Sequence, residues 1–236
     1  MIKSDLHTHS IASGHVTTDT IAQMAKQAAR MNMSLLGITD HGPATLGSCK
    51  SSYFRSLAYA PKERFGVPVF YGVELNILDQ NGSVDLDSHI LSGLDYAVAS
   101  MHTQNIPSGT IEENTAGYLN AMKNPAVKII GHCDDTKYPV DYQALVAAAK
   151  EYHVLLEINN ASLSPLGYRG DTRSNNETLL NYCLAYAHPV ILSSDSHGCS
   201  HLGDVSYAEA LIEKVGFPES LILNNQIEKL KDFIQR

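Results

Sequence analysis

The chain has 236 residues, a formal net charge of −8 and 44% hydrophobic residues, which is enough to bury one substantial core. The acidic balance and the lack of a long basic run argue against a broad nucleic-acid surface. The four cysteines have no C-x-x-C spacing and indicate free thiols in a reducing compartment. Without a signal-like amino terminus or an apolar run of about 20 residues, we expect a cytoplasmic protein with no membrane partner.

Short apolar runs alternate with helical patterns through the first half of the chain. Such runs are typical of buried parallel strands, and they predict strands at residues 2–5, 35–38, 67–73 and 96–99. Apolar residues at helical spacing predict a helix that is capped by Thr17 or Thr18. A short helix is predicted over residues 114–123, whereas residues 44–63 are polar and irregular.

The second half continues the same alternation. Strands are predicted at residues 128–130, 154–158 and 190–192, and helices are predicted to start at Asp141 and at Asn175 or Asn176 and to cover residues 205–215 and 226–234. Seven strand-then-helix units indicate parallel strands with helices packed outside, as one α/β domain over residues 1–236. The irregular segments 44–63 and 162–174 follow strand ends and are candidate substrate loops.

Nine potential metal ligands follow these apolar runs. We call them the donor set: His7, His9, His15, His41, Glu74, His102, His132, Asp195 and His197. In an α/β barrel the active site is built where the strands exit, and purely structural histidines have no reason to share that one rim. His7 and His9 are two residues apart in an extended segment, so both rings point to the same side. The sequence therefore predicts a metal cluster.

These residues resemble the PHP (polymerase and histidinol phosphatase) hydrolases, and most closely the YcdX-type phosphatases. The motifs that carry the resemblance extend over nearly the whole chain. They are Asp5-Leu6-His7-Thr8-His9, His15, Ile38-Thr39-Asp40-His41-Gly42-Pro43, Gly72-Val73-Glu74, His102, His132, Leu156-Glu157-Ile158-Asn159-Asn160 and Ser194-Asp195-Ser196-His197.

The resemblance implies a distorted (β/α)7 barrel with three divalent metal ions at its rim. When the family's motifs are matched to this sequence, His7, His9, Glu74 and Asp195 are the ligands of the first ion. Glu74 bridges to a second ion that is also held by His102 and His132, and His15, His41 and His197 hold the third. By analogy with the family, the resemblance also implies that the chain could assemble into a homotrimer. The chain departs from its relatives at Cys133-Asp134-Asp135, where they continue with Pro-Gly, and at Ser48–Tyr53.

The charge of such a cluster favours an anionic substrate. The donor set carries −2, and three divalent ions would bring the total to about +4, which suits a phosphate dianion and a metal-bound hydroxide. We therefore expect a phosphatase that hydrolyses a small phosphomonoester, with the ions lowering the pKa of water and holding the phosphoryl oxygens. Nitrogen-rich ligands favour zinc, with manganese and iron as alternatives.

Further side chains are candidates for roles at the same rim. We count Glu74, Asp195 and His197 as catalytic together with Asp5 and Asp40, which either orient imidazoles or pass a proton through water to the leaving group. The substrate-binding candidates are Asn159, Asn160 and Arg169, the last as a bidentate phosphate clamp. Lys137 and Arg173 are weaker candidates for the same role.

Three other functions fit parts of this pattern. An amidohydrolase acting on a lactone or amide also uses H-x-H on a barrel strand, but it lacks the third set His15, His41 and His197. A PHP-type nuclease is disfavoured by the acidic balance. A structural or storage metal site closes all its coordination positions with protein ligands, whereas the second and third sets here have only three each.

Overall fold

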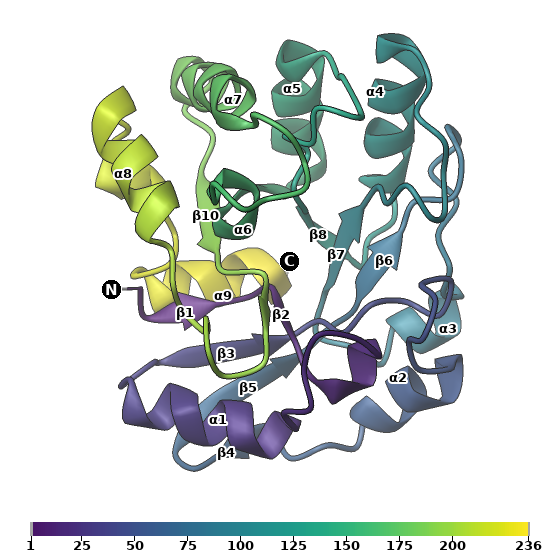
Figure 1. Cartoon of the computed structure of the whole chain (residues 1–236), viewed down its shortest axis with the longest axis vertical. Helices are drawn as coiled ribbons and strands as arrows, with labels where there is room; N and C mark the ends of the chain where they lie inside the picture. The colour runs from purple at the N-terminus through teal and green to yellow at the C-terminus, as the bar shows by residue number, and fades with distance from the viewer. Residues whose placement is uncertain (1, 236) are drawn as a thin grey trace.

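The computed structural model describes residues 2–235 and contains parallel strands surrounded by helices (Figure 1). A five-stranded sheet has the order β10-β9-β8-β7-β6, and a four-stranded sheet has the order β1-β3-β5-β4, with only β4 antiparallel. The strands are β1 Ser4–Asp5, β2 Thr8–His9, β3 Leu35–Ile38, β4 Glu63–Arg64, β5 Val67–Tyr71, β6 Glu74–Asn76, β7 Ala97–Ser100, β8 Val127–Ile130, β9 Leu155–Asn159, β10 Val190–Ser193 and β11 Ser196–His197.

Short pairings link the two larger sheets at the carboxyl ends of their strands. β11 pairs in parallel with β2, placing His197 opposite His9, so the last strand region meets the first. On the other side, an isolated parallel bridge joins His41, which follows β3, to Glu74 of β6. The sequence expectation of an α/β fold with parallel strands is confirmed, although the hydrogen bonds divide the strands among three sheets instead of one continuous barrel.

Helices cover the outside of the strands, and most of the core lies between the two layers. The helices are α1 Ile21–Arg30, α2 Ser51–Leu57, α3 Ser88–Leu91, α4 Ile111–Ala121, α5 Tyr142–Tyr152, α6 Asn160–Leu163, α7 Arg173–Ala185, α8 Ser206–Val215 and α9 Ile227–Gln235. Burial of their apolar faces supplies most of the stabilisation, as expected for amphipathic helices. Among residues 2–235, no helix has the length and apolar character needed to cross a membrane.

A second, smaller core fills the space enclosed by the strands. Leu35 and Leu155, the first residues of β3 and β9, and Ile129 of β8 belong to the same cluster as Leu230 and Ile234 of α9. The helix α9 therefore covers the amino-terminal ends of the strands, leaving the carboxyl ends for polar groups. Tyr96 belongs to this core, and its hydroxyl donates to the carbonyl of Leu6 at 2.6 Å.

The buried side chain of Asn224 joins β1 to β10, two strands that do not pair directly. Its Nδ2 donates to the carbonyls of Ser4 (2.9 Å) and Leu192 (2.7 Å), and its Oδ1 accepts from the amide of Leu192 at 2.9 Å. One amide side chain thus satisfies backbone groups that a strand ladder would otherwise pair.

Several element boundaries differ from the sequence prediction. Thr20, not Thr17 or Thr18, caps α1 through a capping box with Gln23. A second capping box at Thr110 starts α4 three residues before the predicted helix at 114–123. The segment 44–63, predicted to be irregular, contains α2 and ends in β4. The cap of α5 at Asp141 is confirmed.

We expect Asn224→Ala to lower the free energy of unfolding by about 2–4 kcal/mol, because it removes three buried hydrogen bonds and leaves their backbone partners unpaired. Chemical denaturation measures this change. The neighbouring Asn225→Ala is the matched control, since Asn225 makes one exposed hydrogen bond to the amide of Lys3 and should cost much less. Equal losses in the two variants would contradict the bridging role.

Candidate metal centre

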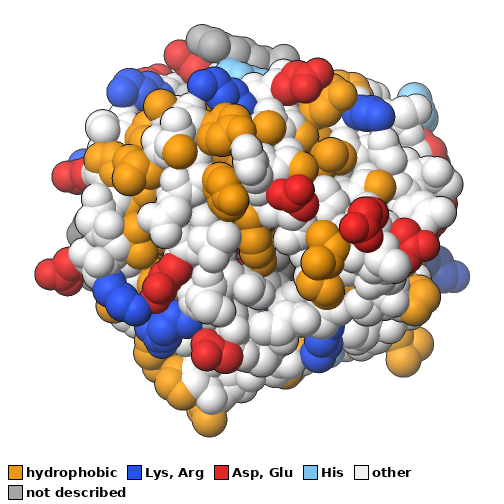
Figure 2. Space-filling view, turned by 90° about the horizontal axis from the view of Figure 1, so that it is seen from above, with side chains coloured by type: hydrophobic (Ala, Val, Ile, Leu, Met, Phe, Trp, Pro, Cys, Tyr) orange, Lys and Arg blue, Asp and Glu red, His pale blue; other side chains and the backbone are white. Residues whose placement is uncertain are grey.

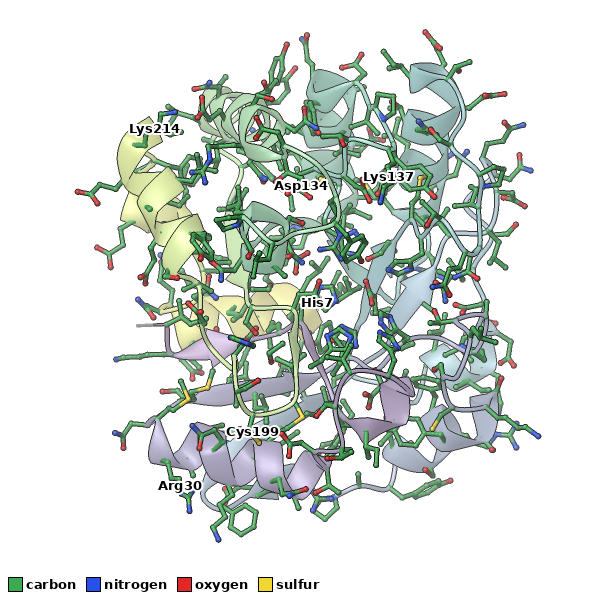
Figure 3. All side chains as sticks on the ribbon, viewed as in Figure 1. His7, Arg30, Asp134, Lys137, Cys199 and Lys214 are labelled. Carbon is green, nitrogen blue, oxygen red and sulfur yellow. The ribbon has the colours of Figure 1, made fainter. Side chains whose placement is uncertain are left out.

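The structure brings all nine members of the donor set together at the carboxyl ends of the strands. His7 lies between β1 and β2, at the middle of the molecule in the view of Figure 3. Neighbouring imidazoles lie close around it: the ring centroids of His7 and His9 are 5.1 Å apart, and those of His9 and His41 are 4.3 Å apart. The predicted convergence of residues from the first strand to the last is therefore present.

Glu74 lies at the centre of this cluster and is almost fully buried. Its two carboxylate oxygens face five imidazoles, with distances of 2.9 Å to His132 Nε2, 3.2 Å to His102 Nε2, 3.3 Å to His7 Nε2, 2.5 Å to His41 Nδ1 and 3.6 Å to His9 Nε2. Burial opposes ionisation, but the surrounding histidines, led by His102 and His41, hold the pKa of Glu74 well below its usual range. Glu74 is therefore a buried, ionised carboxylate that could ligate a cation together with these histidines.

The ring nitrogens that face away from the centre are held by hydrogen-bond acceptors. His7 Nδ1 lies 2.7 Å from Glu157 Oε1, and His102 Nδ1 lies 2.7 Å from Asn76 Oδ1. An acceptor on Nδ1 fixes the tautomer in which Nε2 carries a lone pair for a metal. His7 Nε2 is buried without a hydrogen-bond partner among the described residues, as is His9 Nε2, and a cation would satisfy both.

His15 and His197 provide a second test of whether cations fit. Their Nε2 atoms are 3.1 Å apart, and each Nδ1 faces a backbone carbonyl, that of Ser13 at 3.0 Å and that of Asp195 at 3.3 Å. Because a carbonyl only accepts, both Nδ1 atoms carry the hydrogen when the rings are neutral. Two lone pairs then face each other, an arrangement that a shared divalent cation would stabilise.

Three groups of potential ligands have donor atoms within 4.8 Å of one another. They are His7, His9 and Asp195; His41, Glu74 and His102; and His9, His41 and His197. The donors are mostly nitrogen with some carboxylate, a set that suits zinc and neighbouring transition metals. The residues present therefore fit a polynuclear metal centre.

Asp40 supports the cluster through an intermediate hydroxyl, and within residues 2–235 none of its hydrogen bonds is made to an imidazole. Ser13 Oγ donates to Asp40 Oδ1 at 2.8 Å and faces His9 Nδ1 at 3.0 Å. Asp40 also accepts from the amide and hydroxyl of Ser10 and from the Tyr53 hydroxyl. The expected orientation of an imidazole by Asp40 is thus relayed by Ser13.

Asp5 has a different role from the one the sequence suggested. Its carboxylate accepts from the Ser194 hydroxyl at 2.5 Å and from the Gly203 amide at 2.9 Å, and no imidazole nitrogen of the described residues bonds to it. Its pKa is raised to about 6 because it is buried. The prediction that Asp5 orients an imidazole was wrong. It assumed that the strand alternation continues from Asp5 to His7, whereas β1 ends at Asp5. Asp5 instead fixes the backbone next to Asp195.

Arg169 is the predicted substrate ligand that the structure places best. It is 4% exposed and lines a cavity of about 360 Å³ together with donor-set residues such as His102 and His197. Its Nη2 donates to Asp195 Oδ2 at 3.1 Å and its Nη1 to Ser162 Oγ at 3.1 Å, while Nε is buried without a partner among the described residues. An oxyanion in the cavity would complete this guanidinium.

Asn159, the last residue of β9, and Asn160, the first residue of α6, are not among the residues that line the cavity. Asn159 Nδ2 donates to Glu157 Oε2 and Asp195 Oδ2, so it orders carboxylates behind the centre. Asn160 Oδ1 accepts from the amides of Tyr207 and Ala208, at the start of α8. Since α8 has no side-chain cap of its own, Asn160 serves as that cap through Oδ1. Its predicted contact with substrate stays a prediction.

The weaker candidates also lie outside the cavity wall. Lys137 Nζ donates to the carbonyl of Tyr168 at 2.9 Å and lies 5.0 Å from the centroid of its ring. Arg173 is the first residue of α7 and is exposed.

The sequence analysis missed several buried residues that hold the donor set in place. Glu157 accepts from His7 Nδ1 and from the amide of His132 at 2.7 Å, and its carboxylate within the apolar run 154–158 was the available signal. Asp134 accepts from Ser162 Oγ at 3.1 Å and from Asn176 Nδ2 at 2.5 Å. Through Ser162 it braces Arg169.

Fold and site together define an α/β protein with a candidate polynuclear metal centre at the carboxyl ends of its parallel strands. The PHP domain family matches residues 5–163, more than half of the chain. The chain therefore belongs to the PHP family, and the resemblance inferred from the motifs is confirmed.

Relatives of similar length support this assignment. A probable phosphatase of Clostridium acetobutylicum is 39% identical over 231 residues, covering 98% of this chain and 93% of that protein. A probable phosphatase of Caldanaerobacter subterraneus is also 39% identical, over 98% of this chain and 90% of that protein.

Solved structures share the fold at low sequence identity. Histidinol phosphate phosphatase from Lactococcus lactis, complexed with zinc, L-histidinol and phosphate, aligns with a TM-score of 0.60 at 18% identity, over 91% of this chain and 94% of that chain. A chain of archaeal ribonuclease P with mature tRNA aligns with a TM-score of 0.57 at 15% identity, over 97% of this chain and 90% of that chain. One fold thus serves different activities, so the function must be argued from the site.

We expect Glu157→Gln to weaken metal binding by about 10- to 100-fold, because a metal-ligating histidine loses the carboxylate that orients it and raises its basicity. The affinity is measured by isothermal titration calorimetry of the metal-free protein with Zn²⁺. Glu177→Gln is the matched control, since Glu177 pairs with Lys214 on the surface. Unchanged affinity in Glu157→Gln would show that His7 does not depend on this carboxylate.

Proposed function

We propose that this PHP-family chain is a metal-dependent phosphatase that hydrolyses a small phosphomonoester with three divalent cations. The observation that carries the proposal is the convergence of the donor set on Glu74. Arg169 lines the adjoining cavity, and its Nε has no hydrogen-bond partner among the described residues. Phosphoryl transfer needs positive charge around the transferred group and little covalent chemistry from the protein. The names of the relatives as probable phosphatases support the same reaction.

In this proposal His7, His9, Glu74 and Asp195 hold the first ion. Glu74 shares a second ion with His102 and His132, and His15, His41 and His197 hold the third. The distances to Glu74 support the bridging role, and the facing Nε2 atoms of His15 and His197 support the third ion. Zinc is the first candidate because the ligands are rich in imidazole, with manganese and iron next.

When bound, the ions supply Lewis acidity and activate a water molecule for attack on phosphorus. The chain's own residues set the geometry. Arg169 orients a non-bridging phosphoryl oxygen through Nε and through the N–H groups of Nη1 and Nη2 that do not bond to Ser162 or Asp195. Asp195, which accepts from Arg169 and Asn159 through Oδ2, keeps Oδ1 directed at His9, at 3.1 Å from its Nε2. Asp5 and Asp40 act as positioning residues behind this wall.

Two observations favour the phosphatase over its alternatives. An amidohydrolase has no use for a third ligand set, yet His15 and His197 meet at 3.1 Å. A nuclease needs a basic track for its strand, whereas Arg169 is the one lysine or arginine among the described residues that line the cavity. On the face seen in Figure 2, acidic and basic side chains are interspersed.

A panel of phosphomonoesters tests the proposed reaction. Zinc-loaded wild-type protein is expected to release phosphate from at least one ester, and chelation to abolish the release, since the ions supply the positive charge. His102→Ala should lower kcat/KM by at least about 100-fold because it removes a ligand. His89→Ala is the matched control, because His89 is exposed on α3. Full activity in chelator or in His102→Ala would refute the metal-dependent mechanism.

Arg169→Lys should raise KM for the ester by about tenfold or more, because lysine keeps the charge but loses the fork that binds two oxygens. Steady-state kinetics with the most active ester of the panel, together with elemental analysis, separates this effect from metal loss at Asp195. Arg173→Lys, an exposed substitution at the start of α7, should leave KM unchanged. An unaltered KM in Arg169→Lys with full metal content would exclude the clamp.

A further inference from the structure

One acidic side chain in the cavity wall lies outside the donor set. Asp135 lines the cavity and is 4% exposed. Its Oδ1 accepts from the amide of Lys137 at 2.9 Å. No lysine, arginine or histidine within residues 2–235 forms an ion pair with its carboxylate. The wall therefore holds a carboxylate that has no ion-pair partner among the described residues.

The rest of the wall provides no cation that is free to bind a second anionic group. Apart from the donor set, Arg169 and Asp135, the residues that line the cavity are neutral: Val16, Met101, Thr103, Gln104, Ala161 and Tyr168. Arg169 already serves Asp195 and, in the proposed function, the phosphate. Lys137 does not line the cavity, and its ammonium donates to the carbonyl of Tyr168. A substrate group beyond the phosphate therefore meets a wall that is neutral apart from one carboxylate. The Lys137 ammonium lies outside this wall, 5.0 Å from the centroid of the Tyr168 ring.

The mouth of the cavity is partly apolar. Val16 is 84% exposed and Tyr168 is 67% exposed, although both line the cavity. The ammonium of Lys137 donates a hydrogen bond to the carbonyl of Tyr168. This bond connects the loop between α6 and α7 to the segment that follows β8. The Tyr168 ring already has Arg169 Cζ at 4.9 Å and Lys137 Nζ at 5.0 Å from its centroid. An apolar leaving group would therefore lie beside Val16 and the edge of Tyr168, with Asp135 in the adjoining wall.

On the basis of the proposed phosphatase function, we propose that Asp135 selects phosphomonoesters whose leaving group is neutral or cationic and rejects those with a second anionic group. Charges in a partly desolvated cavity interact more strongly than in water. A carboxylate or second phosphate on the leaving group would face Asp135 without a compensating cation, whereas an ammonium would be attracted. Selection by such a repulsive element is a common route to specificity.

Three aryl phosphates that differ in the charge of a short para side arm of similar length test this proposal. They are 4-(2-aminoethyl)phenyl, 4-ethylphenyl and 4-(carboxymethyl)phenyl phosphate, whose leaving phenols have similar reactivity. Zinc-loaded wild-type protein is expected to prefer the ammonium ester over the carboxylate ester by about tenfold or more in kcat/KM. Asp135→Asn should bring this ratio close to one, with the rate on the neutral ester little changed. Because the ratio is taken within one enzyme, losses in folding or metal content cancel.

Asp171→Asn is the matched control, since Asp171 lies in the same loop region as Arg169 but is exposed and does not line the cavity. It should keep the wild-type ratio. A wild-type ratio near one, or an equal ratio in wild type and Asp135→Asn, would overturn the selection by Asp135. If none of these three esters turned over, dissociation constants of the matching benzylphosphonates would still decide the charge preference. The proposed function itself fails only if no ester of the wider phosphomonoester panel is hydrolysed.

Discussion

The placement of a buried carboxylate among imidazoles is the constraint on which the rest of this structure depends. Glu74 has five histidine nitrogens within 3.6 Å and almost no exposure to water. Several of these nitrogens carry lone pairs that point inward, because acceptors such as Glu157 and Asn76 hold the opposite ring atoms. A protein interior tolerates such a concentration of unsatisfied polar atoms only where a ligand completes it, and divalent cations are the ligands that match these donors.

The fold serves this constraint by separating apolar from polar ends. The helix α9 and the small inner core cover the amino-terminal ends of the strands, so the carboxyl ends are left for the donors. The β11–β2 pairing brings His197 beside His9, and the side chain of Asn224 joins Ser4 of β1 to Leu192 of β10. Three carboxylates outside the donor set fix the backbone and the rings of its members; they are Asp5, Asp40 and Glu157.

The donor set and the parallel α/β architecture were predictable because strand ends share one edge of the fold, whatever their distance in the chain. The partners behind the donors were harder to predict. The direction of a side chain after a strand depends on local turns, which is why Asp5 bonds to Ser194 and Asn160 caps α8. Asp195 and His132 adopt positive φ angles, which no spacing rule anticipates. Helix starts were misplaced where several threonines compete as caps, as at Thr17, Thr18 and Thr20.

The number and position of bound cations test the central claim most directly. Crystals of zinc-loaded protein, measured on both sides of the zinc absorption edge, give the ion positions from anomalous differences without assumptions about activity. The account predicts three peaks at the carboxyl ends of the strands, with Glu74 between two of them and the third between His15 and His197. Peaks located away from Glu74, or none at this rim in protein that retains full phosphatase activity, would contradict it.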